Sequence, residues 1–256
     1  MPSNSVTDST QKQFGRAAAD YITSSYHANG ADLQSLLAAA QFQGHERVLD
    51  VGTGAGHTAL AVARVTAEVI GLDLTAEMVA SATSLGAERG QANVTFQLGD
   101  ALALPFPDAS FDAVTNRQST HHYADPVQAV AEAARVLKPG AQFLLIDTIS
   151  PEDPALDTFV NCFELLRDAS HVRDWRASEW MRMLQAAGFE AELIERFPIP
   201  LDGDDWTRRM RTPATKVAMI RELFAEANPS QRAGFELRDS PWGLTLPAAL
   251  FRAVKR

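Results

Sequence analysis

The chain has a single cysteine, no long apolar run, and fewer basic than acidic residues. Cys162 cannot form an internal disulfide and stands in no metal-ligand spacing, so we expect a reducing, cytoplasmic setting and no bound metal. No apolar run approaches the roughly 20 residues that a membrane-spanning helix needs, so no membrane insertion is expected. The 23 basic and 32 acidic residues give a net charge of −9, which argues against nucleic acid as the main partner. A neutral or cationic small molecule fits this charge better.

The pattern of short apolar runs predicts an α/β fold. With 256 residues, of which 46% are hydrophobic, the chain is long enough for one large domain with a cap. The first four predicted strands are followed by helical patterns or by loops long enough to cross back in parallel, which is typical of a doubly wound sheet. The predicted strands are 46–51, 67–73, 93–99, 110–116, 141–148, 189–194 and 246–251.

Two further regions surround the predicted sheet. Residues 1–42 show a helical pattern that is broken at 27–30, and their aromatic residues make them too apolar for a loose tail. We expect them to form an N-terminal helical arm that packs over the main domain, 43–256. Insertions at about 150–177 and 198–243 carry three tryptophans among arginines, a composition that is typical of a cap over a pocket.

Three alternating glycines follow the first predicted strand directly. Gly52, Gly54 and Gly56 stand between an apolar run and a helical pattern, and glycine lets a ligand lie against bare backbone. Both dinucleotide and S-adenosylmethionine sites use such a loop. A dinucleotide fingerprint has glycines at its first, third and sixth places, whereas the sixth place here is His57.

Acidic residues end the next two predicted strands. Asp73 stands about twenty residues after Gly52, where a carboxylate can accept both hydroxyls of a ribose; the alternative is a cap of the helix that begins near Thr75. Asp100, beside Ala101, can accept an adenine amino group; the alternative is a solvated loop aspartate. In open α/β sheets, ligands lie beyond the carboxyl ends of the strands, which is where both residues stand.

Five motifs, in order, resemble those of class I S-adenosylmethionine-dependent methyltransferases. The most similar branch is the small-molecule group that includes the ubiquinone and menaquinone-biosynthesis C-methyltransferases. The resemblance implies a Rossmann-like, seven-stranded sheet whose last strand is antiparallel, and S-adenosyl-L-methionine as the cofactor with S-adenosyl-L-homocysteine as its product. The motifs are Leu49–Thr58, Gly71–Met78, Gly99–Ala101, Leu104–Asp112 and Arg135–Gly140.

The same resemblance implies roles for the residues in these motifs. Gly52 and Gly54 would line the methionine part of the cofactor, Asp73 would bind the ribose, and Asp100 with Ala101 would hold the adenine. The arm resembles that of one bacterial subset of the group, in which such an arm closes over the cofactor; ordinary helix packing is the alternative. The cofactor-binding residues that we expect are Tyr21, His27, Asp50, Gly52, Gly54, Gly56, Asp73, Leu74, Asp100, Ala101 and Arg117.

Two adjacent histidines follow the fourth predicted strand. His121 and His122 stand at the rim where the transferable methyl group would point, and an acidic acceptor needs a base that titrates near neutral pH. We therefore predict that one of the two is catalytic. The alternative is that either histidine only braces the loop or caps the helix that begins at Pro126.

The sequence thus predicts methyl transfer to the oxygen or carbon of a small organic acceptor. One alternative is a protein that binds or senses S-adenosylmethionine without transferring its methyl group. A less favoured alternative is a nicotinamide-dependent oxidoreductase, against which His57 argues. The sequence does not determine the oligomeric state.

Overall fold

The computed structural model describes residues 5–22 and 30–256. Its first five strands pair in parallel, and the first four lie within one residue of their predicted bounds. The fifth begins at Leu137 rather than at residue 141. These strands are β1 (Arg47–Val51), β2 (Glu68–Asp73), β3 (Val94–Leu98), β4 (Phe111–Arg117) and β5 (Leu137–Ser150).

Two long strands complete the sheet in the order β3-β2-β1-β4-β5-β9-β7. Strand β9 (Trp242–Lys255) inserts antiparallel between β5 and β7 (Phe189–Asp202). The expected Rossmann-like sheet of seven strands with an antiparallel last strand is therefore confirmed. Two short strands, β6 (Trp175–Arg176) and β8 (Arg238–Asp239), pair with β5 and β9 respectively.

Helices cover both faces of this sheet because its strands are apolar on both sides. In β1, Val48 packs with α3 and α4 on one face, and the next residue, Leu49, packs with α6 and α8 on the other. The described helices are α1 (Ser5–Ile22), α3 (Ala31–Ala40), α4 (His57–Val62), α5 (Ala76–Glu88), the 3-10 turn η1 (Thr120–His122), α6 (Pro126–Val136), α7 (Pro154–Arg167), α8 (Ala177–Ala186), α9 (Gly203–Arg209), α10 (Ala214–Ala225) and α11 (Pro229–Gly234).

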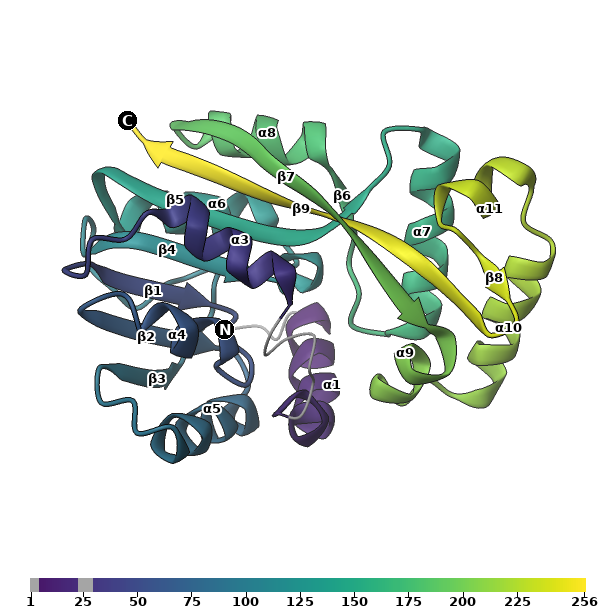
Figure 1. Ribbon diagram of the computed structural model, residues 1–256, viewed down its shortest axis with the longest axis horizontal. Helices are drawn as coiled ribbons and strands as arrows, with labels where there is room; N and C mark the ends of the chain where they lie inside the picture. The colour runs from purple at the N-terminus through teal and green to yellow at the C-terminus, as the bar shows by residue number, and fades with distance from the viewer. Residues whose placement is uncertain (1–4, 23–29) are drawn as a thin grey trace.

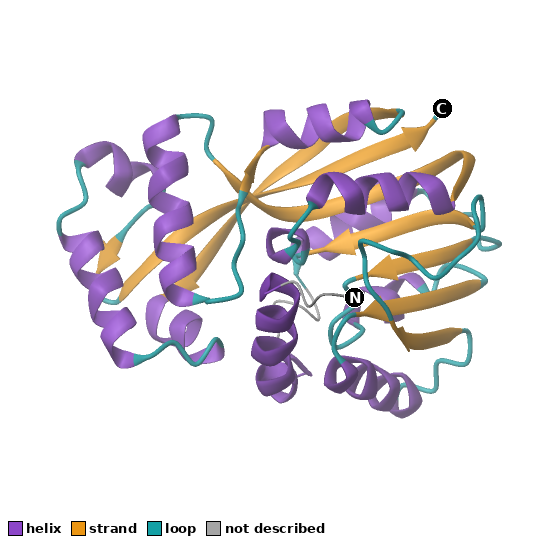
Figure 2. Ribbon diagram, turned by 180° about the vertical axis from the view of Figure 1, so that it is seen from behind, coloured by secondary structure: helices purple, strands orange, loops and turns teal. Residues whose placement is uncertain are grey.

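The far halves of β7 and β9 leave the sheet and carry a separate lobe. The pairing of β5 with β9 ends at Thr148, whereas β7 and β9 stay paired as far as Asp202 and Gly243. Helices α7, α9, α10 and α11 gather around this extension (Figures 1 and 2). Phe163, Trp206 and other aromatic residues form a hydrophobic cluster of the lobe's own. Both predicted insertions contribute to this lobe.

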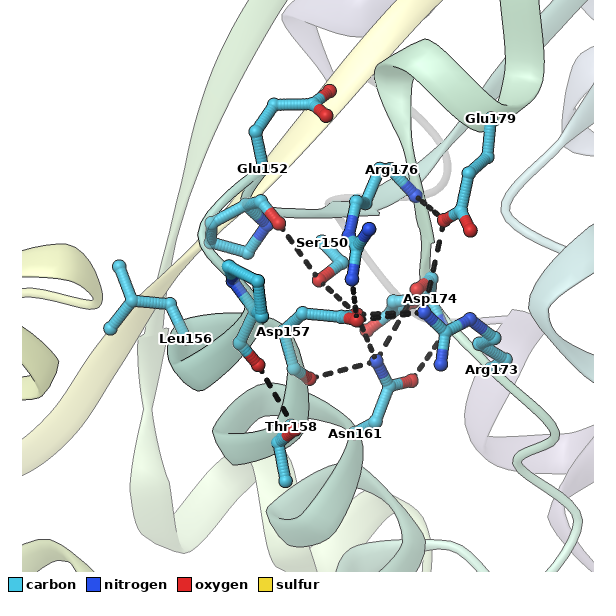
Figure 3. A network of polar contacts seen from close by, with 12 residues as sticks. Ser150, Glu152, Leu156, Asp157, Thr158, Asn161, Arg173, Asp174, Arg176 and Glu179 are labelled. Atoms are coloured by element: carbon cyan, nitrogen blue, oxygen red, sulfur yellow. Dashed lines mark hydrogen bonds and ion pairs between the residues drawn. The ribbon is translucent and has the colours of Figure 1, made fainter. Parts of the chain in front are cut away.

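A polar network ties α7 to the end of the sheet (Figure 3). The buried carboxylate of Asp157 accepts hydrogen bonds from Ser150, Arg173 and Arg176. One turn further along α7, Asn161 accepts from the backbone N–H of Asp174 at 2.7 Å. Because these contacts join α7 to β5 and β6, they fix the side of α7 that faces the sheet.

Helix α1 lies across the junction of sheet and lobe. The side chain of Gln11 donates to the carbonyl of Leu74 at the end of β2, and that of Gln13 donates to the carbonyl of Met210 after α9. Phe14 packs edge-on against His122, with ring centroids 4.7 Å apart. The arm thus contacts both halves of the molecule. None of the described helices is long and apolar enough to cross a membrane.

Candidate active site

The glycine loop joins β1 to α4 with all three glycines in the left-handed region of φ. A Cβ on Gly52 would collide with the hydroxyl groups of Ser119 and Tyr123, so this position admits no side chain. A Cβ on Gly54 would meet nothing within 4 Å, which shows that Gly54 faces open space. The loop therefore brings bare backbone to the carboxyl end of the sheet.

A first cavity, with about 990 Å³ of empty space, opens in front of this loop. It collects residues from the ends of β1, β2, β3 and β4, together with three residues of α1: Thr7, Thr10 and Phe14. The predicted site residues that line it are Gly52, Gly54, Asp73, Leu74, Asp100, Ala101, Arg117 and His122.

Asp50 and Gly56, two of the predicted cofactor-binding residues, do not line this cavity. Asp50 is buried, accepts hydrogen bonds from Thr53 at 2.6 Å and Thr115 at 2.7 Å, and so supports the loop from behind. Burial raises the pKa of Asp50 to about 6. A Cβ on Gly56 would meet Phe96, so this glycine allows the loop to pack closely against β3. Both residues therefore shape the loop, and their direct contact with a cofactor stays a prediction.

The two predicted acidic residues both line the first cavity. Asp73 accepts hydrogen bonds from the backbone N–H groups of Gly54 at 2.8 Å and Thr75 at 2.9 Å. It therefore orders the turn that precedes α5 and holds the glycine loop at the same time. Burial raises the pKa of Asp73. Asp100 accepts from the N–H of Leu102 at 2.9 Å, so its carboxylate also orders the loop in which it stands.

Arg117, at the end of β4, lines the first cavity and forms a bidentate ion pair with Asp32 of α3. Its Nε and Nη2 donate to the two carboxylate oxygens at 2.7 and 2.8 Å, and both side chains are 3% exposed. This pair joins the arm to the sheet beside the cavity. Of the two arm residues predicted to bind cofactor, Tyr21 belongs to α1, and His27 lies outside the described residues.

A second cavity, with about 600 Å³ of empty space, shares residues Gln118 and His122 with the first. Gln118 has a φ of 57°, a strained value for a non-glycine residue that recurs at functional sites. Residues from the sheet side and from the lobe enclose this second space. Its lining is Gln118, His121, His122, Thr148, Glu164, Arg167, Ile199, Leu201, Trp206, Arg209 and Leu246.

The two adjacent histidines differ in charge. His121 is 15% exposed, and its Nδ1 lies 2.6 Å from a carboxylate oxygen of the buried Asp147. Burial alone would lower the pKa of His121, but Asp147, Asp174 and Glu164 raise it to about 9. In turn, the charge of His121 keeps the pKa of Asp147 below its ordinary value, against the effect of burial. At neutral pH the pair is an imidazolium with a carboxylate.

His122 is neutral because burial, followed by the positive charge of His121, lowers its pKa far below its usual range. Its Nδ1 donates to the Ser170 carbonyl at 3.1 Å, and its ring forms part of the wall between the cavities. Next to it, the hydroxyl of Tyr123 receives a hydrogen bond from Asn116 at 2.9 Å, and burial raises its pKa. Of the two histidines, His121 alone is positively charged at neutral pH.

Sequence reasoning missed part of the second cavity. Glu164, Arg209 and Gln118 belong to no sequence motif. For the two charged residues, which lie on helices, exposure to solvent is the usual expectation. Glu164 is nevertheless 4% exposed. The spacing of polar residues at 157, 161, 164 and 168 along α7, opposite the apolar Phe159 and Phe163, was the signal that a buried polar face existed. No group of three or more His, Cys, Asp or Glu side chains among the described residues could hold a metal ion.

Comparisons by sequence and by structure with known proteins find the same relative. Residues 49–145 match the family model described as a methyltransferase domain. The uncharacterised methyltransferase YcgJ of Bacillus subtilis is 42% identical over 247 residues, which cover 95% of this chain and 98% of YcgJ. The crystal structure of YcgJ superposes with a TM-score of 0.85 and covers 88% of this chain and 98% of that chain. A demethylmenaquinone methyltransferase of Deinococcus radiodurans is 40% identical over 118 residues, 44% of this chain and 48% of the relative.

Proposed function

The chain belongs to the class I S-adenosylmethionine-dependent methyltransferases, and from this membership we propose that it methylates an oxygen or carbon atom of a small organic acceptor. The observation that carries the proposal is the pair of cavities that share Gln118 and His122 as a common wall. A protein that only sensed the cofactor would need no second space beside the first. Family membership also removes the nicotinamide-dependent alternative.

The first cavity fits S-adenosylmethionine in the chemistry of its lining. Gly54 faces open space without a side chain, so the methionine part can lie against backbone. Asp73 would accept the ribose hydroxyls, Asp100 and Ala101 would hold the adenine, and Arg117 would face the methionine carboxylate. Bound there, the cofactor supplies an electrophilic methyl group.

The second cavity would hold the acceptor. Its lining combines the apolar side chains of Ile199, Leu201 and Leu246 with a few charged and polar groups, a combination that is typical of small-molecule sites. Holding the acceptor next to the methyl group in a water-poor space contributes several kcal/mol by orientation alone, about 7–11 kcal/mol in the best intramolecular cases. The net charge of −9 supports a small molecule rather than nucleic acid as partner, and the lone cysteine supports a cytoplasmic location.

Of the two predicted catalytic histidines, we assign His121 to the acceptor. His121 lines the second cavity but not the first, and Asp147 holds its ring and its proton. As an imidazolium it stabilises negative charge that develops on the acceptor. We assign His122, which is neutral and buried, to the wall between methyl donor and acceptor. The arm, residues 1–42, would close over the cofactor through α1.

The experiment is a calorimetric titration with S-adenosylhomocysteine, followed by turnover assays with small phenols, quinols and amines. We expect tight binding of the nucleoside, no binding of NAD, and methylation of a small acceptor. Labelling of protein or RNA in an extract, without turnover of any small molecule, would contradict the assignment of the second cavity.

A further inference from the structure

Glu164 is a buried carboxylate in the second cavity that is only half satisfied. Its side chain is 6% exposed, and Oε2 receives a hydrogen bond from Arg167, one turn along α7, at 3.3 Å. Its Oε1 has no hydrogen-bond partner among the described residues. A buried oxygen without a partner is unfavourable, and a ligand hydroxyl in the cavity would supply the missing hydrogen bond.

The surroundings of Glu164 combine positive charge with an apolar surface. His121, Arg167 and Arg209 line the cavity as cations; Asp147, Glu164 and Asp205 respectively pair with them. Trp206 also lines the cavity, and its indole N–H has no partner among the described residues. The apolar wall is formed by Ile199, Leu201 and Leu246. The cavity therefore offers a carboxylate oxygen without a partner among the described residues, several donors and a hydrophobic side.

We propose that the acceptor is a phenol or an enol, and that Glu164 is the catalytic base that takes the proton from its hydroxyl group. The inference rests on the proposed function, since it presumes that the second cavity is the acceptor site. It names both the substrate class of that site and a catalytic residue that no sequence motif indicated.

The chemistry of the acceptor separates a phenol or enol from other classes. An amine arrives as an ammonium ion, which has no free electron pair with which to attack the methyl carbon. An aliphatic alcohol is too weak an acid to yield its proton to a carboxylate. A phenol or enol is acidic enough, enters as a neutral molecule, and develops an oxyanion that the cations of the cavity stabilise.

Burial makes Glu164 a stronger base than an ordinary glutamate. The loss of solvation raises its pKa, and so does Asp174, whereas Arg167, His171 and His121 act in the opposite direction. His121 has the opposite role because it already carries its proton at neutral pH, with a pKa of about 9. One cavity thus pairs a proton-accepting carboxylate with an imidazolium, a division of acid and base set by environment.

The step balances as follows. The acceptor O–H bond breaks and its proton goes to Oε1 of Glu164, while the acceptor oxygen forms a bond to the methyl carbon. The carbon–sulfur bond of S-adenosylmethionine breaks, and its electron pair stays on sulfur, which becomes the neutral thioether of S-adenosylhomocysteine. After product release Glu164 loses the proton to solvent, so one proton is released per methyl group transferred.

The network in Figure 3 holds α7 in the orientation that Glu164 needs to act as a base. Asp157 and Asn161 hold the same side of α7 against β5 and β6, and Glu164 follows Asn161 by three residues. Residues three apart lie on one helix face. The contacts that anchor α7 therefore also orient Glu164 toward the cavity.

The test compares wild type, Glu164→Gln and Glu164→Asp with a series of para-substituted phenols, from para-methoxyphenol to para-nitrophenol, together with a cyclic 1,3-dicarbonyl as the enol. Glu222→Gln, on the exposed side of α10, is the matched control. We expect Glu164→Gln to lower kcat about 100-fold for weakly acidic phenols and to leave para-nitrophenol, already ionised at the assay pH, nearly unaffected. Glu164→Asp should recover part of the lost rate.

A second readout is the pH profile. For weakly acidic phenols, kcat of Glu164→Gln should rise with pH as the phenol itself ionises, a dependence that a purely structural defect would not produce. An equal loss for every phenol, or no loss, overturns Glu164 as the base. Tight binding of S-adenosylhomocysteine by wild type without turnover of any phenol or enol overturns the acceptor class and leaves the proposed function standing. Absence of S-adenosylhomocysteine binding by wild type removes both.

Discussion

The two cavities share a wall, yet they are assembled from different kinds of sequence. Apart from α1, the first cavity draws on residues between Gly52 and Ala124, and it is formed by the ends of β1, β2, β3 and β4 and the segments that follow them. The second draws on positions from Gln118 to Leu246, in β7, β9, two lobe helices and the end of the sheet, and it is formed by charged and apolar side chains. The cavity that we propose for the cofactor is thus formed by a compact set of local motifs. The cavity that we propose for the acceptor is formed by contacts between distant segments.

Because the two cavities are formed by different segments, we predict that a substitution can impair one cavity and leave the other intact. The largest effect is expected for Gly52→Ala, which would place a methyl group against Ser119 and Tyr123 at a φ of 67°. Strain of about 3 kcal/mol corresponds to a loss of about 100-fold in affinity for S-adenosylhomocysteine, measured by calorimetry. Gly140→Ala is the control, since Gly140 has a φ of 76° and open space around it. Affinity within a factor of two of wild type would contradict this account of the loop.

The next largest effect should fall on the second cavity alone. Asp147→Asn removes the charge that keeps His121 protonated, so kcat should drop about 30-fold with the affinity for S-adenosylhomocysteine intact. In wild type the imidazolium is present below pH 9 and lost above it, so kcat for an acceptor that is already ionised should fall as pH rises through about 9. The pH–rate profiles of the two proteins check this. Asp112→Asn, whose carboxylate pairs with Lys138 elsewhere, serves as the control.

Asp73→Asn should impair the first cavity and leave the second intact, with a smaller effect than the preceding substitutions. The substitution replaces an oxygen that accepts from Gly54 or Thr75 by an amide N–H₂, and it removes the carboxylate that we propose as a ribose partner. We expect the dissociation constant of S-adenosylhomocysteine to rise about 10-fold, with little change in the acceptor KM. Asp125→Asn tests for a general effect of losing a charge, because asparagine caps α6 as well as aspartate does. A larger effect on the acceptor than on the nucleoside would break the division between the cavities.

The smallest effect is expected at the anchor of α7. Arg173→Gln removes an ion pair with Asp157 in which the arginine is 31% exposed, and such pairs contribute less than about 1 kcal/mol. We expect a fall of a few degrees in Tm and about a twofold rise in the acceptor KM, with the binding of S-adenosylhomocysteine unchanged. Thermal unfolding and steady-state kinetics measure both. A change confined to nucleoside binding would show that this network serves the first cavity instead. Arg182→Gln, on the surface of α8, is the control.

The sheet could be predicted from sequence because each of its signals is local. Val48 and Leu49 belong to a short apolar run, and the run ends in glycines that only a tight turn requires. Asp125 and Pro126 mark the start of α6 by capping chemistry within a few residues, and the Asp125 side chain indeed accepts from the N–H of Gln128. Such features need no knowledge of the rest of the chain.

The lobe and the acceptor side could not be predicted in the same way. The final strand was expected over 246–251, whereas β9 extends from Trp242 to Lys255, because its length is set by pairing with a partner some fifty residues earlier. Asp50 stands inside the strongest motif, but the motif does not show that its carboxylate is held by Thr53 and by Thr115, which lies 65 residues further along the chain. Glu164 is identified as a candidate site residue only by its burial between the lobe and the sheet.

Helix α1 has a consequence for the timing of turnover. It lines the first cavity with Thr7, Thr10 and Phe14, and it is fastened to the sheet through Leu74 and to the lobe through Met210. Because one segment is bound to both halves, we expect release of the nucleoside from the proposed site to require these hydrogen bonds to open, which would also loosen the lobe. Nucleoside exchange and relaxation of the lobe are therefore expected to occur as one event. The rate of the catalytic cycle then depends on how often α1 detaches from the sheet and the lobe.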